Sequence, residues 1–373
     1  MLPIPHHPLH ARSGRRLLCA ALAITCLDVA SGANANPRSI TTSPDGTVHA
    51  DGLDVPVSEF LSPEARAAMI ARLAVPGAQP TPKIDVPAAR AISAKLSQTV
   101  IDKWQKVYPA RIRSVTMGGV RTDVVVPAAG VAPVNRTRVL INLHGGGFFT
   151  GAGNGGLAEA IPLAGRGRIT VVTVDYRLAP EHHFPAASED VANVYRTLLR
   201  HYKPSHIGIY GCSAGGALVA QALAWFQKEK LPRPGAAGIF CSGAMPSFWY
   251  GGDSYATAPM MNGQYAMARD IAADQINDMY LAQTDSSNPQ ATPGIFPKVL
   301  AQFPPTLLVT GTRDTAMSNA LATNAALLNA GVETQLLVQE GIGHGDFTLM
   351  VGTPEARLAY DVIWRFFDRH LAH

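Results

Sequence analysis

The segment Gly211-Cys212-Ser213-Ala214-Gly215 constrains the fold of this 373-residue chain most strongly. It follows the apolar run Ile207–Tyr210 and opens a stretch of helix formers from Ala214 to Lys230. A G-x-S-x-G pattern between a strand and a helix predicts a sharp turn, because the two glycines let neighbouring chain approach. Such a turn holds the Ser213 hydroxyl above the end of a sheet, beside a helix N-terminus. Ser213 is therefore the candidate nucleophile.

A second glycine-rich segment, His144-Gly145-Gly146-Gly147-Phe148, follows the apolar run Val139–Leu143. Three consecutive glycines lose much backbone entropy on folding, so a loop with only a structural role seldom needs them. Acyl transfer does need them, because its tetrahedral intermediate carries an oxyanion that bare backbone amides stabilise. We expect this loop to supply such amides. A flexible glycine turn is the alternative interpretation.

Two further candidate catalytic residues follow Ser213 in the chain, each just past a predicted strand. Asp314 comes after the run Thr306–Thr310, and His344 comes after the run Glu333–Gln339. Because open parallel sheets gather their ligands at the carboxyl ends of strands, we expect both side chains at one rim. A serine nucleophile needs a base and a carboxylate that orients it, which favours His344 and Asp314. A turn histidine and a helix N-cap are the structural alternatives.

Asp346 is the rival carboxylate, because it lies only two residues from His344. Side chains so close in sequence seldom reach the imidazole Nδ1 with good geometry, so Asp314 ranks above it. Asp274 and Asp285 fall in a segment that we interpret as a cap over the site, and they rank lower still.

A third segment, Asp175–Ala187, reads DYRLAPEHHFPAA and follows the apolar run Ile169–Val174. Together with HGGGF and GCSAGG, it resembles the hormone-sensitive-lipase-like esterases, the bacterial family IV, over about Arg111 to His370. The resemblance implies a serine carboxylesterase with an α/β-hydrolase core, a helical cap and no cofactor. Arg177 and Glu181 are structural residues in that family.

The resemblance also implies the site residues. Ser213 is the nucleophile, His344 the general base and Asp314 its orienting acid. The oxyanion-hole amides are those of Gly146 and Gly147, in the loop that His144 and Gly145 begin, and that of Ala214, directly after Ser213. A substrate pocket wall is expected from Phe148, Phe149, Phe248 and Trp249, although these aromatic residues could equally pack the cap onto the core.

The chain departs from the family at two positions. Cys212 stands where the family usually has an acidic residue before the nucleophile, so a charge near the turn is lost. Asp346 follows His344-Gly345 where the family often has phenylalanine. We expect Asp346 to place an extra carboxylate near the imidazole and to raise the pKa of His344.

Alternating strands and helices predict a mostly parallel, doubly wound sheet of eight strands, with an antiparallel hairpin at Gly118-Gly119. The interval from Cys241 to Pro305 lacks a clear strand and predicts an inserted helical cap. The expected organisation is a signal peptide over 1–35, a leader and cap helices over 36–110, and a catalytic domain over 111–373 with a cap insertion at about 243–300. Residues 36 to about 56, rich in Pro, Gly, Ser and Asp, are expected to form a loose leader. Helices are expected over 62–73, 86–108, 157–165, 187–202, 214–230, 264–269, 274–282, 316–330 and 354–370.

The N-terminus predicts export. Arg12, Arg15 and Arg16 precede an apolar run of about eleven residues that ends near an A-x-A site at Ala33–Ala35. This run is too short to cross a bilayer, and no other long apolar run follows, so no stable membrane insertion of the mature chain is expected. We expect cleavage after Ala35 and a periplasmic or extracellular protein; an uncleaved anchor is the alternative.

The composition of the chain argues against several classes of protein. Apolar residues make up 47% of the chain and charged residues 16%, which provides a sizeable core. The net charge of +4, with no basic cluster, argues against nucleic acid binding. Metal-ligand spacing is absent among Cys and His, and Cys212 and Cys241 are expected as buried free thiols rather than a disulfide.

These observations predict an exported serine carboxylesterase for short- to medium-chain esters, with a homodimer as one possible assembly. An amidase, an acyltransferase or a true lipase would use the same three residues. A non-catalytic binding protein with a hydrolase fold is the alternative outside enzymes.

Overall fold

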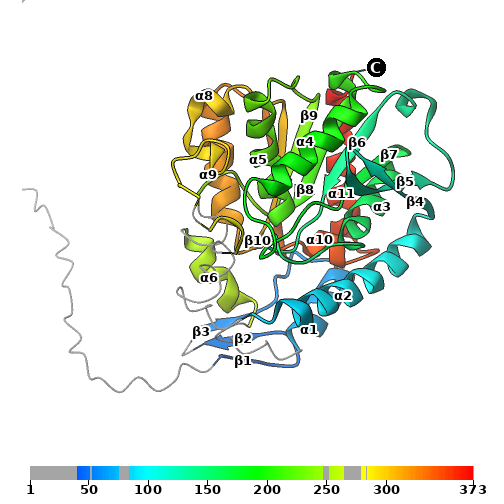
Figure 1. The fold of residues 1–373 in the computed structure, drawn as a ribbon. Coiled ribbons are helices and arrows are strands. Elements are labelled where there is room, and N and C mark those ends of the chain that lie inside the picture. Colours follow the sequence, from blue (N-terminus) through cyan, green and yellow to red (C-terminus); the bar gives the residue numbers. More distant parts are fainter. Residues whose placement is uncertain are drawn as a thin grey trace, which may run out of the picture. The chain divides into compact units, whose positions relative to one another are not determined.

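Eight strands form one sheet in the order β11-β10-β9-β8-β6-β7-β5-β4 (Figure 1). Neighbouring strands from β11 to β7 are parallel, whereas β5 is antiparallel to both β7 and β4. The strands are β4 (Ala110–Met117), β5 (Val120–Pro127), β6 (Val139–Leu143), β7 (Thr170–Val174), β8 (Ile207–Cys212), β9 (Ala236–Phe240), β10 (Thr306–Arg313) and β11 (Thr334–Gly343). The predicted eight-stranded, mostly parallel sheet is confirmed, and Gly118-Gly119 joins the hairpin of β4 and β5.

This computed structural model describes residues 40–50, 53–74, 84–246, 252–263, 279–282 and 284–372. Residues Ser39–His373 form one compact unit. Several predictions lie outside the described residues and stay predictions: the signal peptide over 1–35, Phe248, Trp249, Asp274, the helix over 264–269 and most of the helix over 274–282.

Helices cover both faces of the sheet, because side chains on successive strand residues point to opposite faces. On β6, Ile141 packs in one core with α4, α5 and α9, and Leu140 packs in the other core with α2, α3 and α11. These helices are α2 (Val86–Val107), α3 (Gly155–Gly167), α4 (Ala186–Leu198), α5 (Ala214–Lys228), α9 (Met317–Asn329) and α11 (Pro354–His370). Burial on both faces explains why the central strands are continuous apolar runs.

The two helices predicted before the sheet begin at side-chain caps. In α1 (Pro63–Leu73), the Ser62 hydroxyl accepts the Ala65 N–H at 3.1 Å. In α2, the Asp85 carboxylate accepts the Ala88 N–H at 3.0 Å. Each cap precedes a proline in the first turn, which lacks an N–H that would otherwise need a partner.

The expectation of a loose leader over residues 36–56 is wrong for its described part. Three short strands, β1 (Ile40–Thr42), β2 (Val48–Ala50) and β3 (Leu53–Val55), pair as an antiparallel sheet. Val48 belongs to a third core that also contains Met69 of α1. Strands of three residues among polar neighbours are too short to show an apolar period, which explains the missed sheet.

The insertion contains a helix that the sequence did not predict, α6 (Asp253–Met261). Pro259 lies inside α6, and a proline in a helix interior conceals the helical pattern. Shorter helices follow at η3 (Pro293–Ile295) and α8 (Pro297–Leu300). Among the described residues of 243–300, no strand is present, as the inserted cap requires.

Candidate active site

The turn between β8 and α5 holds Ser213 in a strained backbone conformation. Its φ of 61° and ψ of −126° are unusual for a residue with a side chain. The turn needs glycine at its flank, because a Cβ on Gly215 would lie 1.9 Å from the Leu143 carbonyl oxygen. The Ser213 N–H donates to the Phe240 carbonyl on β9 at 2.8 Å, which ties the turn to the sheet.

The structure brings together the three residues that the sequence selected. His344 Nε2 lies 2.9 Å from Ser213 Oγ, and His344 Nδ1 lies 2.7 Å from Asp314 Oδ1. Ser213 follows β8, Asp314 follows β10 and His344 follows β11, at the carboxyl ends of parallel strands. Asp314 is fully buried, and its carboxylate also accepts the Thr310 hydroxyl and the Ala316 N–H. These bonds fix the carboxylate that orients the imidazole.

The charges around the hydrogen-bonded triad of Ser213, His344 and Asp314 support His344 as the base. Burial of His344 opposes its protonation, but the charge and hydrogen bond of Asp314, with a smaller effect of Asp346, raise the pKa of His344 above its ordinary value. Burial also opposes ionisation of Asp314, yet His344 and two hydrogen bonds hold the pKa of Asp314 below its ordinary value. The predicted effect of Asp346 on the pKa of His344 has the expected direction.

The glycine loop lies against the serine turn. A Cβ on Gly145 would lie 3.2 Å from the Ser213 Cβ. Gly146 and Gly147 have positive φ angles of 115° and 61°, and their amides have no acceptor among the described residues. Ala214 is the first residue of α5, so its N–H has no partner within the helix. These observations agree with an oxyanion hole formed by the three amides, which stays a prediction.

His144 is a structural residue of the loop. Its ring stacks on Tyr176 at 4.2 Å between centroids, and the Tyr176 hydroxyl donates to the His144 carbonyl at 2.7 Å. Burial lowers the pKa of His144, which keeps the ring neutral. The His144 Nδ1 lies 2.7 Å from the Gly145 carbonyl oxygen, so the ring fixes the loop and does not compete with His344 as a base.

Sequence reasoning missed Glu159 of α3. Its carboxylate accepts the Gly145 N–H at 3.2 Å and the Asn142 side-chain amide at 3.0 Å. Burial raises the pKa of Glu159 to about 7, although hydrogen bonds from Asn142 and from the Gly145 and Cys212 backbones oppose the rise. A carboxylate therefore does lie near the serine turn, although Cys212 replaces the acidic residue of the family. A lone glutamate in a helical pattern gives no signal of this contact.

Cys212 and Cys241 are buried free thiols, as predicted. The Cys241 sulfur accepts the Gly345 N–H at 3.2 Å, directly after His344. Burial raises the pKa of Cys241 well above its ordinary value, so this thiol is not a reactive nucleophile.

The rival carboxylates do not replace Asp314. Asp346 is buried, but it binds the guanidinium of Arg72 at 2.8 Å rather than the imidazole. Asp285 is exposed and accepts hydrogen bonds from Ser287. For Asp314, Asp346 and Asp285, the geometry thus agrees with the predicted ranking.

The structure also places the remaining predicted residues. Phe148 is buried, and its ring stacks on Tyr280 of the insertion at 4.1 Å between centroids. Phe149, the next residue, is half-buried. That both rings line a substrate pocket stays a prediction. Arg177 binds Asp190, and Glu181 binds Arg90 of α2, in keeping with structural roles.

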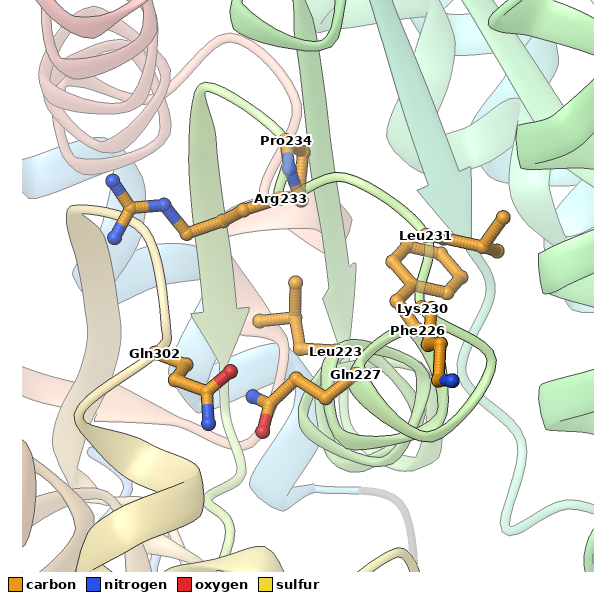
Figure 2. Close-up of a pocket in the computed structure, with 8 residues that line it drawn as sticks. All are labelled: Leu223, Phe226, Gln227, Lys230, Leu231, Arg233, Pro234 and Gln302. Carbon is orange, nitrogen blue, oxygen red and sulfur yellow. The ribbon is translucent and has the colours of Figure 1, made fainter.

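A surface pocket of about 210 Å³ lies elsewhere (Figure 2). It borders the C-terminal half of α5, from Leu223 onward. Ten residues of helix, about 15 Å, separate Leu223 from Ser213, so this pocket is not part of the site. Its lining residues are Leu223, Phe226, Gln227, Lys230, Leu231, Arg233, Pro234 and Gln302.

The described part of the chain lacks two kinds of feature. It contains no group of three or more His, Cys, Asp or Glu side chains that could hold a metal ion. None of its helices combines the length and the apolar character that crossing a membrane requires.

Known proteins resemble this chain in sequence and structure. The profile of the alpha/beta hydrolase fold family matches residues 140–348, more than half of the chain. An esterase of Acinetobacter venetianus is 33% identical over 36% of this chain, and the chain spans only 45% of that esterase. An acetyl-hydrolase of Streptomyces hygroscopicus is 29% identical over 68% of this chain and 81% of its own length. A crystal structure of an esterase from the bacterial hormone-sensitive lipase family has a TM-score of 0.69 and 26% identity, covering 83% of this chain and 99% of that chain.

The strand order, the serine turn and the hydrogen-bonded triad of Ser213, His344 and Asp314 define a hydrolase with a serine nucleophile. The chain belongs to the α/β-hydrolase fold family, and its predicted relationship to the hormone-sensitive-lipase-like carboxylesterases is confirmed.

Proposed function

We propose that the protein is an exported serine carboxylesterase that hydrolyses short- to medium-chain esters through an acyl-enzyme on Ser213. One observation carries the proposal: Ser213 Oγ, His344 and Asp314 form a hydrogen-bonded relay of 2.9 and 2.7 Å beside three available amides. Hydrolysis by these groups needs no cofactor.

The relay performs the reaction in two halves. Ser213 Oγ attacks the ester carbonyl while His344 takes its proton, and Asp314 stabilises the imidazolium. The amides of Gly146 and Ala214, with that of Gly147, bind the oxyanion. His344 then protonates the leaving alcohol, and the acyl group stays on Ser213. In the second half, water gives a proton to His344 and attacks the acyl carbon. His344 then returns this proton to Ser213 Oγ as the bond between Ser213 and the acyl group breaks, which releases the carboxylic acid.

Two observations favour small acyl groups. The relative from Streptomyces hygroscopicus is an acetyl-hydrolase. The insertion contributes Tyr280, whose buried ring stacks on Phe148 at the end of the glycine loop, so the insertion packs directly on this loop and would restrict a pocket beside it. Export is supported by the basic, apolar and small-residue regions of residues 1–35. The place of action would be the periplasm or the medium.

A panel of p-nitrophenyl esters of increasing acyl length, with a fluorophosphonate probe, tests the proposal. We expect hydrolysis and labelling by the wild type and neither by Ser213→Ala. Ser287→Ala, which alters an exposed serine of the insertion, is the matched control and should keep both. Labelling without ester hydrolysis would indicate an amidase or acyltransferase. Absence of labelling would indicate a binding protein and refute the proposal.

A further inference from the structure

A buried carboxylate fixes the backbone on both sides of His344. Asp346 Oδ2 accepts the Gly343 N–H at 2.8 Å, from the residue before His344. Asp346 itself begins the short helix α10 (Asp346–Leu349), just after His344. A Cβ on Gly343 would lie 2.7 Å from Asp346 Oδ2, so the contact is closely packed. Asp346 therefore sets the conformation of the turn that presents the imidazole.

The partner of Asp346 comes from the opposite end of the sequence. Arg72, near the end of α1, donates from Nη1 to Asp346 Oδ1 at 2.8 Å. Its Nη2 donates to the Asn262 side-chain oxygen at 2.9 Å. Asn262 in turn donates to the Arg313 carbonyl at 2.9 Å, and Arg313 directly precedes Asp314. One guanidinium thus connects the turn of His344 with the strand end of Asp314.

Apolar packing holds the N-terminal segment (residues 53–74) on the same turn. Met69 and Leu73 of α1 share a buried core with Ile342 and Met350, which lie on either side of His344. Figure 1 shows α1, α6 and α10 at the same end of the sheet. The ion pair therefore lies at the edge of a packed contact: the Asp346 carboxylate is buried, whereas the Arg72 side chain is 37% exposed. A guanidinium and a carboxylate interact more strongly at such a half-buried position than in water.

The charges around His344 come from several elements. Asp314 and Asp346 favour the imidazolium, while Arg72 offsets the charge of Asp346. Arg313, on β10, is also close to Asp346 and donates to the Met261 and Pro56 carbonyls.

We propose that Arg72 and Asp346 are positioning residues of this hydrolase, through which the N-terminal segment holds His344 in line with Ser213 and Asp314. The inference rests on the proposed function only for its kinetic test. Arg72 does not act on the substrate; it fixes the turn, and Asp346 sets the electrostatic environment of the imidazole.

A double-mutant cycle of Arg72→Met and Asp346→Asn tests this. We expect each variant to lower kcat roughly 10- to 100-fold, with a much smaller change in KM, because a misplaced base slows the chemical step. The double variant should lose no more than the worse single variant, because both act through one pair. Arg72→Lys, which keeps the charge, should recover part of kcat. In Asp346→Asn, the acidic limb of kcat/KM should move to lower pH.

Arg66→Met is the matched control. Arg66 lies on the same helix and donates to the Val57 and Ser58 carbonyls within the N-terminal segment, without touching the catalytic turns. We expect its kcat and its acidic limb to match those of the wild type. Equal loss of kcat in Arg66→Met, additive losses in the double variant, or an unmoved acidic limb in Asp346→Asn would overturn the proposal.

An NMR titration separates this inference from the proposed function. The imidazole signal of His344, assigned by its loss in His344→Gln, should titrate at lower pH in Asp346→Asn in a Ser213→Ala background. This measurement needs no turnover. A shifted titration without esterase activity in the wild type would refute the function and support the positioning role; an unshifted titration would refute the positioning role.

Discussion

His344 can act as a base because the residues around it decide its protonation. Its ring faces Ser213 Oγ on one side and the fully buried carboxylate of Asp314 on the other. The hydrogen bond to Asp314 places the proton on Nδ1, so that the Nε2 lone pair faces the Ser213 hydroxyl. The tautomer of His344 therefore depends on Asp314, and its raised pKa depends on Asp314 and, to a smaller extent, on Asp346.

Replacing that carboxylate should change both rate and pH dependence. Because the neutral imidazole is the base, kcat/KM falls as pH drops through the pKa of His344, which lies above its ordinary value of 6.5. In Asp314→Asn, we expect kcat to fall about 10³–10⁴-fold and the acidic limb to move to lower pH. Stopped-flow or steady-state hydrolysis of a p-nitrophenyl ester between pH 5 and 9 measures both. An acidic limb at the wild-type position would contradict this assignment.

Glu159 should make stability depend on pH in a defined direction. Its folded-state pKa of about 7 lies above its ordinary value of 4.5, so the native state binds a proton more tightly than the unfolded state. Its contribution to stability is therefore present below about pH 4.5 and is lost as pH rises through about 7. Relative to the wild type, Glu159→Gln should gain about 1–3 kcal/mol of unfolding free energy between pH 5 and pH 8.

Urea unfolding at several pH values measures this difference. Glu59→Gln, which alters an exposed carboxylate, is the control and should follow the wild type. If Glu159→Gln and the wild type show the same pH dependence, the carboxyl of Glu159 is not held in a buried, protonated form near neutral pH.

At the level of elements, the join between β8 and α5 positions the nucleophile. The helix starts directly at Ser213 because Gly215 and Gly211 leave no Cβ in the gap beside β6. The first turn of this helix has N–H groups without an intrahelical acceptor, and it lies directly after Ser213.

A side chain at Gly215 should therefore disrupt both the fold and the site. A Cβ there would lie 1.9 Å from the Leu143 carbonyl and 2.7 Å from the His144 carbonyl, and backbone atoms cannot give way cheaply. We expect Gly215→Ala to lower the unfolding free energy by about 2–3 kcal/mol or more and to abolish ester hydrolysis. In Gly119→Asn, the added side chain meets open space in the hairpin turn, and only the positive φ of 83° adds strain, so the loss of stability should be clearly smaller and activity should be kept. Full activity in Gly215→Ala would contradict the closeness of this join.

The sequence predicted the central strands well, because strands buried on both faces are continuous apolar runs. Their polar ends were harder to place. The prediction ended one strand at Thr310, whereas β10 continues to Arg313, where it pairs with Gly343 of β11. The three short N-terminal strands and α6 were missed, because neither shows a clear period in the sequence. Contacts such as Arg72 with Asp346, 274 residues apart, leave no local pattern at all.

For the whole molecule, the site depends on two kinds of core. The cores on either face of the sheet stabilise the strands that carry Ser213 and Asp314. The third core joins the N-terminal segment to Ile342 and Met350, on either side of His344. This third core is smaller and lies at the end of the sheet, so we expect it to open locally before the molecule unfolds.

Substitutions in the two kinds of core should thus affect activity differently. Met69→Ala opens a cavity in the third core, and we expect it to lose ester hydrolysis at urea concentrations below the global transition seen by tryptophan fluorescence. Ile363→Ala removes a similar buried volume from the core around α11 and should lose activity and fold together, at a lower urea midpoint than the wild type. If activity and fluorescence of Met69→Ala fell at the same urea concentration, the N-terminal segment would unfold with the sheet rather than ahead of it. His344 would then owe its position to the global fold and not to a separate local contact.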